Sequence, residues 1–222
     1  MDLKKLFAFA ADLLFPPRCV FCGCVVSPGA RICGKCAEEA VRTGEVRYMN
    51  LSADGENIKC AALYAYRGVV RKSIVDFKFT GRRECAGFYA QKLAEQIPES
   101  FPGVRFDAVV SVPISAERKR KRGYNQSELL AKELARLLCV PYLPLLQKEK
   151  DNLPQHSLPK GMRCENVRGV YTFCGKKQDV SGRPILLVDD IVTTGNTLHE
   201  CSRLLKRAGV TNTVCAAVAS VE

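Results

Sequence analysis

Residues 185–197 read ILLVDDIVTTGNT, an apolar run that passes through two acids into a turn rich in hydroxyl groups. Four apolar residues in succession predict a buried strand, and the turn after the acids predicts the start of a helix. In parallel α/β sheets, ligands bind beyond the carboxyl ends of the strands, and the free N–H groups of a helix N-terminus bind anions. The stretch therefore predicts a phosphate-binding turn formed by Thr193, Thr194, Gly195, Asn196 and Thr197.

Asp189 and Asp190 stand immediately before this turn. Carboxylates repel a phosphate, but they accept hydrogen bonds from the vicinal hydroxyls of a sugar or hold a divalent cation. An alternative is that the acids only cap the following helix, although two acids and a hydroxyl-rich turn in one register favour a binding role. The sequence contains neither the P-loop motif nor the glycine motif of dinucleotide-binding folds. The pattern therefore predicts a phosphorylated sugar as the ligand.

Apolar runs and helical periodicities alternate along the rest of the chain. Because strands are followed by helices, the pattern predicts an α/β fold with a doubly wound parallel sheet. A polar stretch at 147–167 has no periodicity and predicts either a functional loop or disorder, with a short strand at 170–173 after it. The other expected strands cover 58–66, 106–113, 184–188 and 213–218, and the expected helices cover 69–81, 84–97, 125–138 and 198–208.

The N-terminal part of the chain is predicted to form a separate unit over residues 1–50, followed by the α/β domain over residues 51–222. Apolar residues recur at helical spacing between Leu3 and Leu14, and the pair Pro16-Pro17 ends this expected helix. The cysteine-rich segment begins directly afterwards. The unit is therefore expected to consist of one helix and a metal-binding segment.

Two CxxC pairs, at 19–22 and 33–36, lie in this segment. Four thiolates in paired knuckles match a tetrahedral structural zinc site, and a short unit without its own core needs a metal to fold. A redox CxxC is one alternative, but no βαβ pattern surrounds either pair. We expect zinc to be held by Cys19, Cys22, Cys33 and Cys36, and Cys24 could replace Cys22 as a ligand.

Residues 118–122 read RKRKR, and Gly123 follows where the chain turns into the next expected helix. A solvated surface loop is the usual interpretation of such a charge run. Here the run follows an expected strand, so it should lie on the sheet edge that carries the sugar site, where a pyrophosphate would need cations. The same cations could reach the phosphates of a nucleic acid. We therefore expect a basic anion-binding loop.

Composition narrows the class of protein further. With 222 residues, 47% hydrophobic and 26% charged, the chain can bury a core, which excludes disordered, collagen-like and coiled-coil proteins. The formal net charge of +11 predicts anionic partners, and 12 cysteines in a chain of this length favour a reducing compartment over a disulfide scaffold. Without a cleavable signal or a long apolar run, the chain is expected to be cytoplasmic and to have no membrane span.

The stretch at 185–197 resembles the binding signature of type I phosphoribosyltransferases. This resemblance implies that Asp189 and Asp190 contact the ribose hydroxyls of phosphoribosyl pyrophosphate (PRPP), while residues 193–197 surround its 5-phosphate. Arg122 and Gly123 are similar to the pyrophosphate loop of adenine-type enzymes, and Tyr124 beside them completes the expected substrate-binding residues.

Nearly the whole chain resembles the ComF family of bacterial competence proteins. The resemblance rests on the zinc knuckles, the sequence RGYNQ at 122–126, the spacing of residues 155–166 and the signature at 189–197, and Lys78 also matches a family position. It implies that residues 51–222 form a phosphoribosyltransferase-like domain behind a zinc-binding N-terminus. It further implies a link to the uptake of single-stranded DNA in natural transformation and protein partners in the competence machinery.

Two functions are compatible with these features. The first is an enzyme that binds PRPP with Mg²⁺ and transfers ribosyl phosphate to a nitrogen nucleophile that the sequence does not identify. The second is a non-catalytic competence protein that binds single-stranded DNA through the same anion pocket. No catalytic residue is assigned, because neither His156 nor His199 lies near a nucleophile partner in the sequence.

Overall fold

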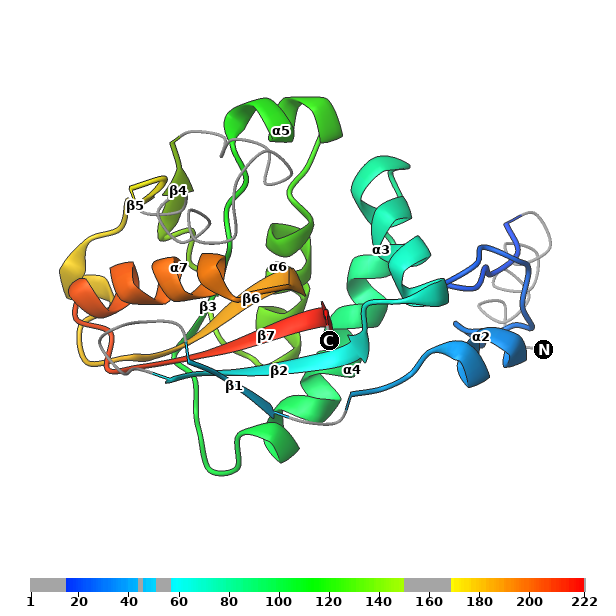
Figure 1. Cartoon of the computed structure of the whole chain (residues 1–222), viewed down its shortest axis with the longest axis horizontal. Coiled ribbons are helices and arrows are strands. Elements are labelled where there is room, and N and C mark those ends of the chain that lie inside the picture. The colour runs from blue at the N-terminus through cyan, green and yellow to red at the C-terminus, as the bar shows by residue number, and fades with distance from the viewer. Residues whose placement is uncertain (1–14, 44–45, 51–56, 150–168, 222) are drawn as a thin grey trace, which may run out of the picture.

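The computed structural model describes residues 15–43, 46–50, 57–149 and 169–221. Figure 1 shows a central sheet with helices in front of it and behind it. β1 pairs with β2 in antiparallel orientation, and the three other strand pairs are parallel. In spatial order the five strands are β1 (Val46–Asn50), β2 (Asn57–Ala65), β7 (Asn212–Ser220), β6 (Pro184–Val192) and β3 (Ala108–Ser111).

Helices cover both faces of this sheet, as Figure 1 shows. The helices are α2 (Gly34–Glu39), α3 (Gly68–Phe79), α4 (Cys85–Ser100), α5 (Ala116–Arg122), α6 (Gln126–Leu137) and α7 (Asn196–Arg207), with a short 3-10 helix, η4, at Lys177–Asp179. Successive side chains of a strand point to opposite faces. Leu186 and Val188 therefore join the core under α4 and α6, whereas Ile185 and Leu187 join the core under α7. The predicted doubly wound α/β sheet is confirmed.

The predicted strands and helices around the sheet are confirmed, with one difference at the acids. The strand was expected to end at Val188, but β6 continues through both acids to Val192. The reason is that β7 offers a partner over the whole length: Asp189 pairs with Ala217 and Val192 pairs with Ser220. The acids are therefore held in the sheet rather than in the following turn.

The basic run at 118–122 was expected to be a loop, and this expectation is wrong, because the run belongs to helix α5. The Ser115 side chain accepts a hydrogen bond from the N–H of Arg118 and caps the helix start. At the other end, Gly123 adopts a left-handed conformation with φ of 77° and donates its N–H to the carbonyl of Lys119. Lys and Arg are good helix formers and are favourable near the C-terminus of a helix.

A second sheet contains two antiparallel strands, β4 (Leu146–Lys148) and β5 (Tyr171–Phe173). β5 confirms the short strand expected at 170–173, whereas β4 and β1 were not expected because such short strands give little alternating pattern. The spacing at 155–166 and the helix expected before Pro16 fall outside the described residues. Within the described part of the chain, no helix is both long enough and apolar enough to cross a membrane.

The cysteine-rich segment packs against α3 and α4, and Figure 1 shows it beside α3. Between the first two cysteines, Val20 and Phe21 are almost completely buried. The Phe21 ring lies edge-on to Tyr64 at 5.5 Å between ring centroids and to Phe88 at 6.1 Å. This segment therefore shares one hydrophobic core with the sheet domain, and the boundary expected near residue 50 does not separate two cores.

Replacing Phe21 by Ala should destabilise the whole protein rather than only the cysteine-rich segment. The ring is fully buried, and truncating a buried Phe to Ala costs about 3–5 kcal/mol of unfolding free energy. Phe15→Ala is the matched control, because the Phe15 side chain is 81% exposed and should contribute little. Urea denaturation followed by circular dichroism measures both variants, and equal stabilities would contradict the shared core.

Candidate functional site

A cavity of about 400 Å³ lies at the carboxyl ends of β6 and β3. Four elements that are distant in the sequence contribute charged side chains to its wall. These side chains are Lys78 from α3, Arg118 and Arg122 from α5, Lys148 from β4, and Asp189 and Asp190 from β6. Thr193 and Thr197 of the predicted phosphate turn also line it. The cavity thus combines acids, cations and hydroxyl groups at the sheet edge predicted for ligand binding.

Asp190 forms an ion pair with Lys78, whose Nζ lies 2.9 Å from Asp190 Oδ1. Both side chains are largely shielded from water, with 18% of Lys78 and 11% of Asp190 exposed. An ion pair in this position is screened less by solvent than a surface pair. Lys78 matched a family position in the sequence without an assigned role, and the structure places it in the cavity wall, paired with Asp190.

Asp189 is held by two hydrogen bonds to the same oxygen. The Ser127 hydroxyl donates to Asp189 Oδ1 at 2.8 Å, and the backbone N–H of Asp190 donates to it at 2.8 Å. Burial and the neighbouring charge of Asp190 raise the pKa of Asp189 to about 7. This carboxyl can therefore accept or release a proton near neutral pH.

The predicted phosphate turn joins β6 to α7. Thr193 and Thr194 are exposed, and Gly195 adopts a left-handed conformation with φ of 78° directly before the helix. This conformation is strained for residues with a Cβ, which explains the glycine. The first N–H groups of a helix have no partner within it. A phosphate bound beside Thr197 would meet these N–H groups together with threonine hydroxyls.

Helix α5 turns only part of the basic run toward the cavity. Arg118 and Arg122 are four residues apart, so they share one face of the helix, and both line the cavity. Lys119 instead pairs with Glu128 at 3.0 Å, and Lys121 pairs with Glu117 at 2.6 Å. The helix thus separates cations that face the cavity from cations that are paired with glutamates.

Tyr124 lies in the core instead of beside the cavity. Only 5% of the residue is exposed, and its hydroxyl donates a hydrogen bond to the Phe77 carbonyl. Its ring also lies under the Arg83 guanidinium, 4.7 Å from the ring centroid. The structure therefore separates Tyr124 from Arg122 of the same expected loop, and Gly123 between them ends α5.

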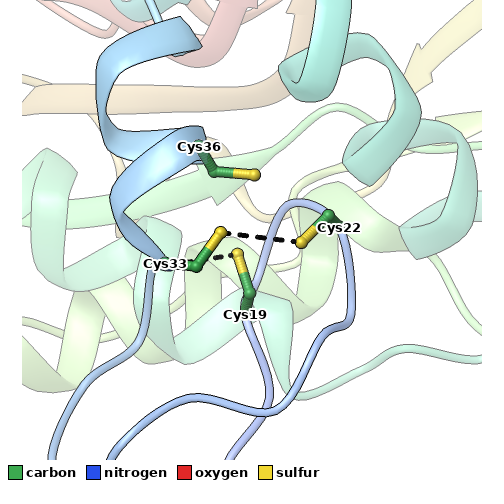
Figure 2. Close-up of side chains that lie close together, drawn as sticks. All are labelled: Cys19, Cys22, Cys33 and Cys36. Atoms are coloured by element: carbon green, nitrogen blue, oxygen red, sulfur yellow. Dashed lines mark hydrogen bonds between the residues drawn. The ribbon is translucent and has the colours of Figure 1, made fainter.

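The four predicted zinc ligands form one cluster of sulfur atoms. Figure 2 shows the Cys19, Cys22, Cys33 and Cys36 sulfurs pointing toward one another, and all of them lie within 4.8 Å of one another. The Cys22 and Cys33 sulfurs are 3.8 Å apart. A tetrahedral zinc ion with Zn–S bonds of about 2.3 Å has sulfurs roughly 3.8 Å apart, so the donor set fits zinc.

Cys24 lies beside this cluster, with its sulfur 3.3 Å from the Cys22 sulfur. Hydrogen bonds with the backbone and the side chain of Cys24 lower the pKa of Cys22 to about 6, although burial opposes this shift. A thiolate is the form of cysteine that binds metals. The exchange of Cys24 for Cys22 as a metal ligand stays a prediction.

Asp189→Asn should stabilise the protein increasingly as the pH rises from 4 to 7, in buffer without divalent cations. The pKa of about 7 in the folded protein lies above the ordinary value of about 3.9. The folded state therefore binds more protons than the unfolded state in this window, and wild-type stability falls as the pH rises. Asn keeps the acceptor oxygen for Ser127 but cannot ionise.

Thermal denaturation at several pH values measures this effect, with Asp107→Asn as the control because Asp107 is exposed. The midpoint difference between Asp189→Asn and wild type should grow up to about pH 7 and then level off. A difference that does not depend on pH would show that Asp189 is not buried as an acid with a raised pKa.

Comparison with known proteins gives two family matches. A model of the phosphoribosyl transferase domain matches residues 124–221, and a model of the double zinc ribbon domain matches residues 10–46. The first match contains β6, the threonine turn and α7, and the second contains the sulfur cluster. The chain therefore has the α/β fold of type I phosphoribosyltransferases and an N-terminal zinc ribbon.

Two adenine phosphoribosyltransferase structures are among the solved structures similar to this chain, at low identity. The Saccharomyces cerevisiae enzyme is 19% identical with a TM-score of 0.43, covering 85% of this chain and 90% of the other. The Thermoanaerobacter pseudethanolicus enzyme is 15% identical with a TM-score of 0.43, covering 83% and 99%.

Three curated relatives are more similar in sequence. Competence protein F of Haemophilus influenzae is 27% identical over 201 residues, which cover 87% of this chain and 80% of that protein. Competence protein ComFC of Bacillus subtilis is 30% identical over 67% of this chain and 58% of its own length. The DNA utilization protein YhgH of Salmonella typhimurium is 34% identical over 60% and 59%. The chain thus spans less than two thirds of the last two proteins. As a homologue of these proteins with a zinc ribbon before its phosphoribosyl transferase domain, the chain belongs to the ComF family.

Proposed function

We propose that the cavity binds PRPP with Mg²⁺ and that the protein transfers ribosyl phosphate to an acceptor that is still unidentified. The observation that carries this proposal is the convergence in one cavity of the acids at the end of β6, the threonine turn and the cations of α3 and α5. A pocket of about 400 Å³ is of the size that proteins use for small ligands. The phosphoribosyl transferase match supports the same ligand class.

The charges of the cavity suit the separate parts of PRPP. The threonine turn and the N-terminus of α7 would bind the 5-phosphate, and the carboxylates of Asp189 and Asp190 would accept hydrogen bonds from the ribose hydroxyls. Arg118 and Arg122 would face the pyrophosphate. Each part of the ligand thus has residues of the appropriate charge or hydrogen-bonding type in the cavity wall.

In the proposed reaction, the bond between C1 of the ribose and a pyrophosphate oxygen breaks, a nitrogen of the acceptor bonds to C1, and that nitrogen loses a proton to the solvent. Positive charge develops on the ribose, and negative charge develops on the leaving pyrophosphate. The carboxylates of Asp189 and Asp190 in the cavity wall would stabilise the positive charge on the ribose. The guanidinium groups of Arg118 and Arg122 would stabilise the negative charge on the pyrophosphate. Mg²⁺, bound with the substrate, supplies further neutralisation of the pyrophosphate oxygens, and carboxylates are among its usual protein ligands.

The cysteine cluster is proposed to hold one structural zinc ion on Cys19, Cys22, Cys33 and Cys36. The mutual distances of the sulfurs support this ligand set, as does the zinc ribbon match. Thiolate ligands require reduced cysteines, which supports the cytoplasmic location expected from the sequence.

A link to DNA uptake is part of the proposal, because the relatives are named for competence and DNA utilization. Partners in the competence machinery would follow from that link. For the cavity itself, a small anion is favoured over a DNA strand. Lys119 and Lys121 each have a glutamate beside them, which reduces the positive charge that the basic run presents to a nucleic-acid backbone.

Elemental analysis of the full chain purified under reducing conditions should find one zinc ion per chain. Cys36→Ser should lose this zinc, because Cys36 is a buried member of the cluster and serine is a poor zinc ligand. Cys174→Ser is the control, because Cys174 is exposed on a distant segment and should leave the zinc content unchanged. Absence of zinc from the wild type would contradict the ligand assignment.

PRPP should bind the wild type more tightly with Mg²⁺, and Asp190→Ala or Thr194→Ala should weaken its binding. Removing one hydrogen bond to a charged group costs about 1.5–3 kcal/mol, which corresponds to a roughly 10- to 150-fold loss of affinity. Isothermal titration calorimetry measures the dissociation constants.

Matched controls are Asp107→Ala and Thr211→Ala, which change the same residue types at exposed positions outside the cavity. Unchanged affinity in Asp190→Ala and Thr194→Ala would show that the turn has only a structural role. Single-stranded DNA that binds at low salt and is displaced by PRPP would show that one site serves both ligands, whereas DNA that does not bind at low salt would exclude the DNA-binding alternative.

A further inference from the structure

Helix α3 connects the cysteine cluster to the cavity. Ser73, in the middle of this helix, is fully buried, and its hydroxyl donates a hydrogen bond to the carbonyl of Val20 at 2.7 Å. Val20 lies between the cluster residues Cys19 and Cys22. Lys78 lies five residues after Ser73, or about 7.5 Å along the helix axis, and pairs with Asp190. One helix thus contacts both sites.

Two buried hydroxyl groups depend on this single carbonyl. The Ser73 hydroxyl has one proton, which it donates to Val20, so Ser73 accepts the hydrogen bond that joins it to the Tyr89 hydroxyl at 2.7 Å. Tyr89 is fully buried as well. If the Val20 carbonyl moved away, this pair of hydroxyls would lack one acceptor in the core, which is costly.

The turn of the cysteine cluster fixes the position of that carbonyl. Val20 donates its backbone N–H to Arg31 at 2.9 Å, which joins the segments that carry the two CxxC pairs. Gly23 donates its N–H to the Cys19 carbonyl at 2.9 Å, and Arg82 donates to the same carbonyl at 3.0 Å. The position of the Val20 carbonyl, which accepts the hydrogen bond from Ser73, therefore depends on the geometry of the metal-binding turn.

Aromatic rings continue the connection to the end of α3 that carries Lys78. The Tyr89 ring lies 6.4 Å from that of Phe21 and 6.4 Å from that of Phe77 between centroids. Phe77 contacts Tyr124 at 6.1 Å, and Tyr124 donates its hydroxyl proton to the Phe77 carbonyl. Packed aromatic pairs have preferred geometries, so displacement of Phe21 disturbs the contacts of its neighbours.

The backbone of Lys78 itself is also fixed. Gln126 donates a hydrogen bond from Nε2 to the Lys78 carbonyl at 3.3 Å. Carbonyls in the last turn of a helix have no partner within the helix, so this contact and that of Tyr124 hold the helix end in place. Lys78 therefore approaches Asp190 from a helix that is held at two places. Gln126 of α6 and Tyr124 of the preceding turn hold its end, and the cysteine cluster holds its middle through Ser73.

We infer that the metal-bound cysteine cluster positions Lys78 in the cavity through Ser73 and Phe21, so that zinc and PRPP each strengthen binding of the other. This inference rests on the function proposed above. Without metal, a four-cysteine turn loses its fold, and the Val20 carbonyl and the Phe21 ring lose their fixed places. Ser73 and Phe21 are positioning residues in this arrangement, because they act on Lys78 and do not touch the cavity.

Reciprocal coupling distinguishes positioning from a merely structural role of the cluster. If zinc raises the affinity for PRPP by some factor, PRPP must raise the affinity for zinc by the same factor. The zinc affinity of the full-length wild type can be measured by equilibrium competition with the chelator 4-(2-pyridylazo)resorcinol, with and without PRPP and Mg²⁺. We expect PRPP to raise zinc affinity about five- to tenfold, within the usual range of coupling between sites.

Asp190→Ala controls for direct binding of zinc by PRPP in solution. This variant should bind PRPP weakly, and PRPP should therefore leave its zinc affinity unchanged. If the wild type binds PRPP but its zinc affinity does not change when PRPP is added, this inference is wrong and the proposed function is unaffected. A zinc-loaded wild type that does not bind PRPP would overturn both.

A pair of variants tests the path through α3. Ser73→Ala removes the link to Val20 and should lower PRPP affinity several-fold even with zinc bound. Gln96→Leu is the matched control, because Gln96 is a buried residue of α4 whose side chain donates a hydrogen bond to the Ala62 carbonyl of β2, away from α3. It should lower the melting temperature without changing PRPP affinity. Equal PRPP affinities in the two variants at full zinc loading would contradict the path, and the wild-type competition decides the coupling even if Ser73→Ala fails to fold.

Discussion

The two adjacent carboxylates of Asp189 and Asp190, at the end of a buried strand, each need a cation or a hydrogen-bond donor, and the rest of the site supplies these partners. A carboxylate that leaves water costs free energy unless a cation or hydrogen-bond donors face it. Asp190 has the ammonium group of Lys78 at 2.9 Å, and Asp189 has the hydroxyl of Ser127 at 2.8 Å. Lys78 comes from the end of α3 and Ser127 from the first turn of α6. The burial of the acids and the placement of the two helices therefore depend on each other.

The cysteine-rich segment meets a similar constraint by a different route. The turn between Cys19 and Cys22 offers only two apolar side chains, which are too few to form a core. Both are buried against α3 and α4 instead, and the carbonyl of Val20 becomes an acceptor for a buried hydroxyl. A proposed metal ion would fix the turn, while the neighbouring helices supply the core. This division of roles explains why the segment and the sheet domain share one hydrophobic cluster.

The sequence predicts the parts of the site that are contiguous and misses those that only tertiary contacts bring together. Asp189, Asp190 and the threonine turn were recognised because strand, turn and helix follow one another within thirteen residues. Ser127 and Lys148 carry no local signal, and the fold alone brings them to the acids. The helix at 116–122 did have local signals in Ser115 and Gly123, but the charge run was interpreted as a loop. The burial of Tyr124 could not be predicted, because it depends on Phe77 of another helix.

The distribution of charge bears more on the ligand than the total charge does. A net charge of +11 suits nucleic acids as well as small phosphates. A strand of DNA is bound along a groove, usually by cations that follow the backbone and by aromatic rings that stack on bases. Helix α5 offers that pattern only in part, because glutamates beside Lys119 and Lys121 offset their charge and the neighbouring Tyr124 is buried. The cations that remain directed at one place, Arg118 and Arg122, face a concave site that also contains acids. Acids would repel a continuous polyanion but suit a ligand with hydroxyl groups between its phosphates, so the arrangement favours a phosphorylated sugar.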